Sequence, residues 1–217
     1  MNNDQILYLL QGAWGTVELS VLTFVFSAAL GLAIALMRVS ASQTLRGCAF
    51  GYINLIQGTP LLVIMGVCFY GPSILGFTET SPMFAAVLAL TVHAAAFLGE
   101  IWRGCIESVP KNQWEAAECL GLNRIQRMFK VILPQALRIA TPPTVGFMVQ
   151  IVKNTSFASL VIGFAELSYN AKILNNSTFK PFLYFGVAAA LYFVICYPLS
   201  WVSLKLERKL TVARDQG

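Results

Sequence analysis

Apolar segments of membrane-spanning length are the feature that most constrains how this 217-residue chain can fold. A bilayer core of about 30 Å requires roughly 20 apolar residues in each helix that crosses it. Segments of about this length cover residues 13–37, 52–70, 82–102, 139–160 and 182–204. Only 12% of the residues are charged, which is about half the share found in soluble proteins. We therefore expect an all-α integral membrane protein with five transmembrane helices, forming a single domain over residues 1–217.

The basic residues indicate how these helices are oriented. Twelve of the 15 Lys and Arg residues fall on one side of the predicted spans, and Lys153, Lys172 and Lys180 fall on the other. Connections that carry the excess of Lys and Arg face the cytoplasm. The N-terminus is therefore predicted outside and the C-terminus in the cytoplasm, with a cytoplasmic connection at about 103–138. This orientation accounts for the net charge of +5 without a nucleic-acid partner.

The cytoplasmic connection at 103–138 is too polar to lie in the membrane and carries helix signals. A first short helix is predicted from Asn112, which can cap it together with Glu115 three residues later. It is predicted to end at Gly121, since glycine readily adopts the left-handed conformation that terminates a helix. A second helix is predicted over residues 123–134, with the same kind of capping box at its start.

Two alanines, Ala116 and Ala117, give the first of these helices a nearly flat face that a partner surface could approach closely. Spacing alone leaves two interpretations equally open. The connection is either an ordinary helical hairpin between two spans or a docking element for another protein.

This connection resembles the EAA loop of the permease subunits of ABC importers. The matching residues are Glu115, Ala116, Ala117, Gly121, Leu133 and Pro134, with Val131 where the family usually has Ile. Other segments are similar to the polar amino-acid branch of these permeases. The first of these segments has Gly12, Thr16 and Ser20 at intervals of four residues. The second is the sequence GTPLL at 58–62, preceded by Gln57 where the family has Arg, and the third is KNTS at 153–156. The chain is thus identified as a member of this family, which implies the type I importer fold.

The resemblance implies a subunit of an ATP-driven importer of polar amino acids in the bacterial inner membrane. The helix around Glu115 would dock on an ABC ATPase dimer, which binds ATP and Mg, so that this chain carries no cofactor. A second permease, similar or identical, would complete the pore, and an extracytoplasmic binding protein would deliver the solute. One feature of the sequence is consistent with ATP binding by another subunit. The chain has no Gly-Lys dipeptide, and therefore no P-loop motif for ATP.

Ionisable residues at membrane depth are candidate functional groups because burying them is costly. His93 and Glu100 lie seven residues apart in the third predicted span, so both point from the same helix face. They could line the solute pathway. Alternatively, a neighbouring helix satisfies His93, and Glu100 pairs with Arg103 one turn away.

The fourth predicted span supplies the other candidates for the solute pathway. They are Gln150, Lys153, Thr155 and Ser156. Lys153 could meet a carboxylate, either of the solute or of Glu166, or it could extend to the outer headgroups.

Two other functions fit an apolar chain with buried polar residues. An intramembrane enzyme could use His93 and Glu100, but the sequence has one His, whereas a metalloprotease motif needs two. A secondary carrier would usually contain repeated halves, which five spans cannot supply symmetrically. Five widely spaced Cys residues with no CxxC pair predict no metal site.

Overall fold

The computed structural model describes residues 1–76 and 81–215, and the side chains of residues 1–76 and 81–210. Its helices are α1 (Asn3–Arg38), α2 (Gln43–Gln57), α3 (Leu61–Ile74), α4 (Pro82–Glu107), α5 (Lys111–Cys119), α6 (Arg124–Gln126), a π-helical segment (Arg127–Ile132), α7 (Leu133–Asn154), α8 (Ser156–Val161), α9 (Leu167–Thr178) and α10 (Pro181–Asp215). No strand occurs in the described part of the chain. The predicted all-α class is confirmed.

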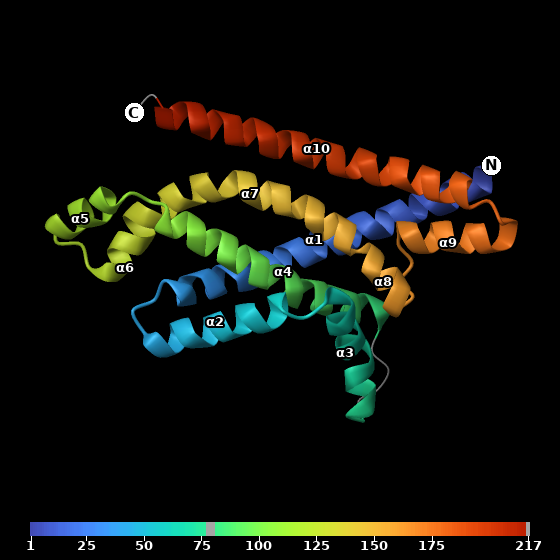
Figure 1. Cartoon of the computed structure of the whole chain (residues 1–217), viewed down its shortest axis with the longest axis horizontal. Coiled ribbons are helices and arrows are strands. Elements are labelled where there is room, and N and C mark those ends of the chain that lie inside the picture. The colour runs from blue at the N-terminus through green and yellow to red at the C-terminus, as the bar shows by residue number, and fades with distance from the viewer. Residues whose placement is uncertain (77–80, 216–217) are drawn as a thin grey trace.

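The long helices α1, α4, α7 and α10 run along the longest axis of the molecule (Figure 1). The two termini lie at opposite ends of this axis, with α5 and α6 at the end that carries the C-terminus. The α8 and α9 helices lie at the other end, near the N-terminus. The chain therefore places its polar helical connection and its C-terminal tail at one end of the bundle.

Small residues allow α1 and α4 to pack closely at the centre of the bundle. A Cβ added to Gly31 would lie 3.0 Å from the Cβ of Leu98, and one added to Gly99 would lie 2.8 Å from Cγ2 of Ile34. Membrane helices associate through such close contacts, because lipid gives them no hydrophobic driving force. The α1–α4 pair is thus the centre against which α2, α3, α7 and α9 pack, whereas α10 packs on α7 and α9.

Three described helical segments are long and apolar enough to cross a membrane: Asn3–Arg38, Pro82–Glu107 and Pro181–Leu210. The α2–α3 pair could form a fourth crossing, although its two helices are bent by 100°. The 22-residue α7 is not among these segments. The predicted count of five spans is therefore not confirmed by length and composition.

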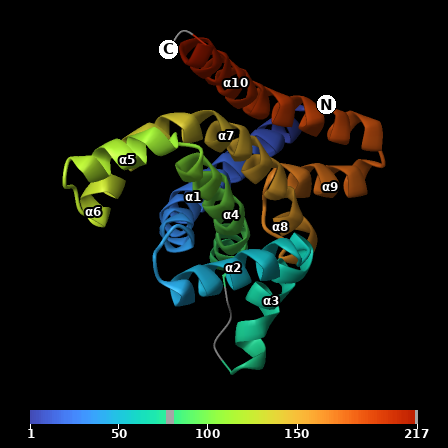
Figure 2. The ribbon, with the colours of Figure 1, turned by 60° about the vertical axis from the view of Figure 1, so that its left-hand side comes forward.

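The predicted second span, residues 52–70, is divided between two helices, α2 and α3. Gly58 ends α2, and Pro60, with a φ of −58° and no N–H, precedes the first residue of α3. The hydroxyl of Thr59 donates to the carbonyl of Leu55 at 2.7 Å, which satisfies one acceptor at the break. Figure 2 shows α3 directed away from α2 beyond this point.

The predicted fourth span, residues 139–160, also has different bounds. The α7 helix begins at Leu133 and ends at Asn154, with Pro142 and Pro143 inside it. A neighbouring helix supports this proline pair, because the Ser203 hydroxyl on α10 donates to the Pro142 carbonyl at 2.8 Å.

Candidate functional site

The α5 helix lies at one end of the bundle, within the region predicted to dock on a partner. It begins at Lys111, and its N-terminal cap is Pro110, whose φ is −54°. No side chain caps this end, so the predicted capping role of Asn112 is wrong. Proline fixes φ near the helical value and has no N–H to satisfy, which explains a cap two residues before the predicted Asn112.

The end of α5 is the one predicted from Gly121. This residue has a φ of +72°, a left-handed conformation that favours glycine. Its N–H donates to the carbonyl of Glu118 at 2.9 Å, and the N–H of Leu122 donates to Ala117 at 3.3 Å. These two bonds form a Schellman motif, which satisfies carbonyls that the last helical turn leaves without donors.

A capping box follows the turn, as predicted for residues 123–126. Oδ1 of Asn123 accepts from the N–H of Gln126 at 2.9 Å, and Oε1 of Gln126 accepts from the N–H of Asn123 at 3.0 Å. The predicted end of this second helix at Pro134 is wrong. The chain instead passes through the π-helical segment Arg127–Ile132 directly into α7, where Pro134 stands in the first turn. Pro134 cannot donate a backbone hydrogen bond to the preceding turn, and it stands directly after the π-helical segment, where the hydrogen-bond pattern of the helix changes.

The two alanines of α5 face different ways. Ala117 is buried at 2% exposure, whereas Ala116 and Glu115 are exposed. Consecutive residues of a helix are rotated by about 100°, so the predicted flat face formed by both alanines is wrong. Glu115 and Ala116 belong to the exposed surface of α5, and Leu120, directly after the helix, is 77% exposed.

Polar and apolar contacts join α5 to the membrane helices. Nη1 of Arg127 lies 2.6 Å from Oε2 of Glu118. Nε2 of Gln135 on α7 donates to Oε1 of Gln113 at 3.2 Å. The Trp114 ring packs on a core cluster at this end of α4 and α7. Because of these contacts, a displacement of α5 would be transmitted to α7.

Two other residues predicted for the coupling loop lie at the start of α7, where Leu133 is half-buried and Pro134 is exposed.

The second candidate site is a cavity of about 350 Å³ among the membrane helices. It is lined by Leu61, His93, Phe97, Phe147, Gln150, Asn154 and Phe157. The rings of His93 and Phe97 lie 4.9 Å apart, and Phe147 stacks on Phe97 at 5.7 Å. Nε2 of Gln150 donates to Oδ1 of Asn154 at 2.9 Å. Nδ1 of His93 is buried with no hydrogen-bond partner among the described residues. The pocket, as we call this cavity, thus combines aromatic walls with three polar side chains.

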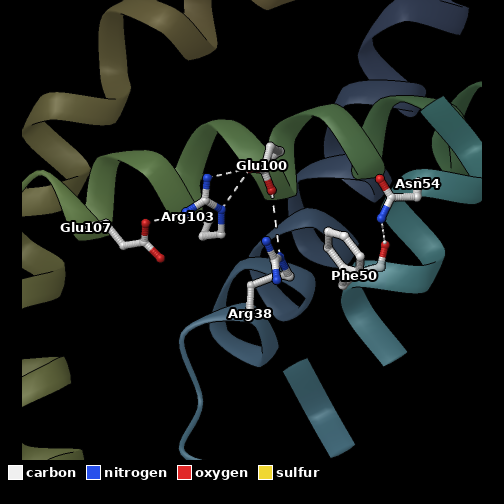
Figure 3. Close-up of polar contacts among 6 residues, drawn as sticks. All are labelled: Arg38, Phe50, Asn54, Glu100, Arg103 and Glu107. Atoms are coloured by element: carbon white, nitrogen blue, oxygen red, sulfur yellow. Dashed lines mark hydrogen bonds and ion pairs between the residues drawn. The ribbon is translucent and has the colours of Figure 1, made fainter. Parts of the chain in front are cut away.

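Glu100 is not part of the pocket, although it shares a helix with His93. Its Oε1 lies 2.5 Å from Nη2 of Arg103, and its Oε2 lies 3.8 Å from Nε of Arg38 (Figure 3). Arg103 also pairs with Glu107, one turn further along α4. The alternative prediction, that Glu100 pairs with Arg103, is confirmed.

Three other predicted pathway residues do not line the pocket. The Thr155 hydroxyl is buried and donates to the Val152 carbonyl at 2.8 Å. The Ser156 hydroxyl donates to the carbonyl of Lys153 at 2.7 Å. The Lys153 side chain is exposed, and it forms no ion pair with Glu166 in the described part of the chain.

Glu166 is fully buried and joins three helices, a role that the sequence analysis missed. Its Oε2 accepts from the hydroxyls of Tyr192 on α10 at 2.5 Å and Thr16 on α1 at 3.4 Å. Its Oε1 accepts from the N–H of Tyr169 on α9 at 2.8 Å. The available signal was a lone carboxylate after a long apolar stretch, which needs partners if it is buried.

Comparison with known proteins gives the family and the fold class of this chain. Residues 27–212 match the family model described as "Binding-protein-dependent transport system inner membrane component". The L-cystine transport system permease protein TcyB of Bacillus subtilis is 37% identical over 200 residues, which cover 92% of this chain and 85% of that protein. The probable glutamine ABC transporter permease protein GlnM of the same organism is 34% identical over 207 residues, 95% of each chain.

A solved structure agrees with these relatives. The crystal structure of an amino acid ABC transporter with histidines contains a chain of 32% identity that superposes with a TM-score of 0.86. The match covers 93% of this chain and 94% of that one. The chain belongs to the family of binding-protein-dependent transport system inner membrane components. It is an ABC-importer permease subunit of the branch whose relatives are named amino-acid permeases, not an enzyme, and ATP hydrolysis belongs to a separate subunit.

Proposed function

We propose that this chain forms one half of the pore through which an ABC importer takes up polar amino acids. In this proposal five segments cross the bacterial inner membrane, with the N-terminus outside and the C-terminus in the cytoplasm. The opposite positions of the two termini support an odd number of crossings (Figure 1). The excess of Lys and Arg at the α5 end supports the cytoplasmic assignment of that end.

The α5 helix would couple the pore to the ATPase. The observation that carries this assignment is its attachment to α7 through the Gln113–Gln135 contact, while Glu115 and Ala116 remain exposed. A partner that moves this exposed surface would move the membrane helices with it. ATP and Mg would be bound by an ABC ATPase dimer on the cytoplasmic side, and Gly121, Leu133 and Pro134 would hold the coupling helix and its exit in place.

Two further proteins complete the proposed transporter. A second permease chain, similar or identical to this one, would supply the other half of the pore. A solute-binding protein outside the membrane would deliver the amino acid, and the family description, which refers to binding-protein-dependent transport, supports such a partner. Relatives named for cystine and glutamine support a polar amino acid as the solute.

The pocket would form part of the solute pathway. Its polar groups come from His93, Gln150 and Asn154, and its walls are aromatic. Binding sites for small molecules typically combine mostly apolar walls with a few polar groups. Lys153, Thr155 and Ser156 follow at the end of α7, and we propose that they line the path beyond the pocket. Glu100, paired with Arg38 and Arg103, would lie on the cytoplasmic part of the path.

The test is ATPase activity of the complete transporter in nanodiscs, with and without a panel of amino acids. The preparation contains this chain, its ATPase and its binding protein. We expect hydrolysis to be stimulated by the binding protein loaded with a polar amino acid. A chain that binds no ATPase and transports amino acids down an ion gradient would contradict the proposal and favour a secondary carrier.

We expect His93→Ala to weaken solute affinity by about tenfold, which corresponds to one lost polar contact in the pocket, while maximal ATP turnover changes little. The physical reason is that the buried Nδ1 of His93 has no partner among the described residues and is available to the solute. The measurement is the solute concentration that gives half-maximal uptake in proteoliposomes. Val92→Ala, next to His93 but outside the pocket lining, is the matched control. Equal kinetics in both variants would assign His93 a structural role only.

A further inference from the structure

A basic stripe follows one face of the C-terminal part of α10. We define it by Trp201, Leu204, Lys205, Arg208 and Lys209, which together line a hollow of about 510 Å³. Three of these five residues are cations, and none is an acid. We infer that the basic stripe binds the anionic headgroups of phospholipids at the membrane surface.

The packing of α10 leaves this stripe free of its own chain. Ser203 faces α7, because its hydroxyl donates to the Pro142 carbonyl at 2.8 Å and lies 3.1 Å from where a Cβ on Gly146 would stand. Residues two positions before and after Ser203 are rotated from it by about 200°. Trp201 and Lys205 occupy these positions, so the stripe lies on the side of α10 that is opposite α7.

The stripe begins where the lipid-facing surface of α10 ends. Phe193, Val194 and Tyr197 are 63%, 64% and 55% exposed, so this part of α10 presents apolar side chains outward. Trp201 follows at 52% exposure, and tryptophan is enriched where a membrane helix reaches the headgroup layer. The three cations follow at positions 205, 208 and 209. Basic residues next to a membrane helix attract anionic lipids, because they lie within reach of the charged surface.

The charges of the stripe are arranged for an anion rather than neutralised within it. Nζ of Lys205 lies 4.7 Å from the centre of the Trp201 ring, so the aromatic face holds the ammonium without removing its charge. Glu207 lies four residues after Ser203, which directs it toward the α7 side of the helix. It is not among the residues that line the hollow. A phosphate in the hollow would therefore meet Lys205, Arg208 and Lys209 together.

The excess of basic residues at this end of the bundle explains only that cations are present. It does not explain why three of them share one face with an exposed tryptophan, opposite the face that packs on α7. A headgroup site requires this arrangement, because the phosphate needs several cations and the adjoining acyl chains need an apolar surface. The inference is independent of the proposed solute and of the coupling role of α5.

The test uses spin-labelled phosphatidylglycerol and phosphatidylcholine with the complete transporter in nanodiscs. Electron paramagnetic resonance measures the share of each lipid immobilised on the protein. We expect a preference for phosphatidylglycerol that weakens at high salt. The double variant Lys205→Gln/Arg208→Gln is expected to reduce this preference by about tenfold, given the attraction of each basic residue for an anionic surface.

The matched control is Lys172→Gln/Lys180→Gln, which removes two exposed cations at the opposite end of the bundle. The inference is overturned if both double variants keep the wild-type preference. It is also overturned if inorganic phosphate displaces the lipid from the Lys205/Arg208 site while chloride at the same ionic strength does not, since that outcome identifies a site for a free anion. Loss of the ATPase subunit from the Lys205→Gln/Arg208→Gln complex, with lipid preference unchanged, would assign the stripe to the ATPase interface and overturn it as well.

Discussion

Gly121→Asp and Glu115→Lys are each expected to reduce amino-acid uptake to background, although both variants insert into the membrane. Gly121 has a φ of +72°, a conformation that costs a residue with a Cβ about 1–2 kcal/mol. The added carboxylate would also lie at the C-terminal end of α5, where the helix dipole disfavours negative charge. Glu115→Lys reverses the charge on the exposed surface that we assign to the ATPase contact. Uptake in proteoliposomes and recovery of the ATPase with the permease are the measurements.

Two control variants separate a docking defect from a folding defect. Gly76 also has a positive φ, +83°, and a Cβ added to it would meet nothing within 4 Å, as at Gly121. Gly76→Asp therefore carries a similar backbone cost far from α5 and should retain uptake. Glu115→Gln removes the charge without reversing it and should retain part of the uptake. Normal transport by Glu115→Lys or Gly121→Asp would show that α5 is not the coupling element.

The end of α5 could be predicted from sequence because it depends on local chemistry. Gly121 and the capping box of Asn123 and Gln126 need only neighbours within a few residues, and the structure contains both. The start of the same helix was mispredicted because two local signals compete there. Asn112 can cap a helix, but Pro110, whose φ is fixed by its ring, caps α5 at an earlier position.

The direction of each side chain in α5 could not be predicted, because burial depends on the rest of the fold. Ala116 and Ala117 are equally small, and which one faces inward depends on where α7 and the end of α4 lie. Hydropathy also failed at residues 58–60. Apolar residues continue on both sides of this Gly-Thr-Pro run, so the 100° bend between α2 and α3 is not visible in the apolar pattern.

Two of the residues predicted for the solute pathway, His93 and Gln150, line the pocket. His93 was identified because ionisable groups at membrane depth are costly. Glu100 and Glu166 show the limit of this argument. Each is satisfied by the chain itself, Glu100 by arginines and Glu166 by hydroxyl and amide donors. Partners that lie 150 residues away, such as Thr16 for Glu166, are visible only in the folded structure.

The second large effect is expected at the contact between α1 and the segment around Glu166. A Cβ added to Gly15 would lie 2.6 Å from the carbonyl oxygen of Ala165. This neighbour is backbone, so Gly15→Ala forces α1 and the segment apart. The separation also weakens the bond from the Leu167 N–H to the Thr16 hydroxyl, which is 3.2 Å long. Overpacking of this kind costs about 1–3 kcal/mol of folding free energy, so we expect a clearly lower melting temperature of the purified permease.

The matched control for Gly15→Ala is a helical glycine with open space beside it. Gly186 on α10 is exposed, and a Cβ added there meets nothing within 4 Å. Alanine is favoured over glycine inside a helix by about 1 kcal/mol, so Gly186→Ala should leave the melting temperature unchanged or raise it slightly. The same propensity gain accompanies Gly15→Ala, so the difference between the two variants isolates the steric cost. Equal melting temperatures would mean that α1 and the Glu166 segment can separate freely, and that the buried carboxylate does not hold the two together.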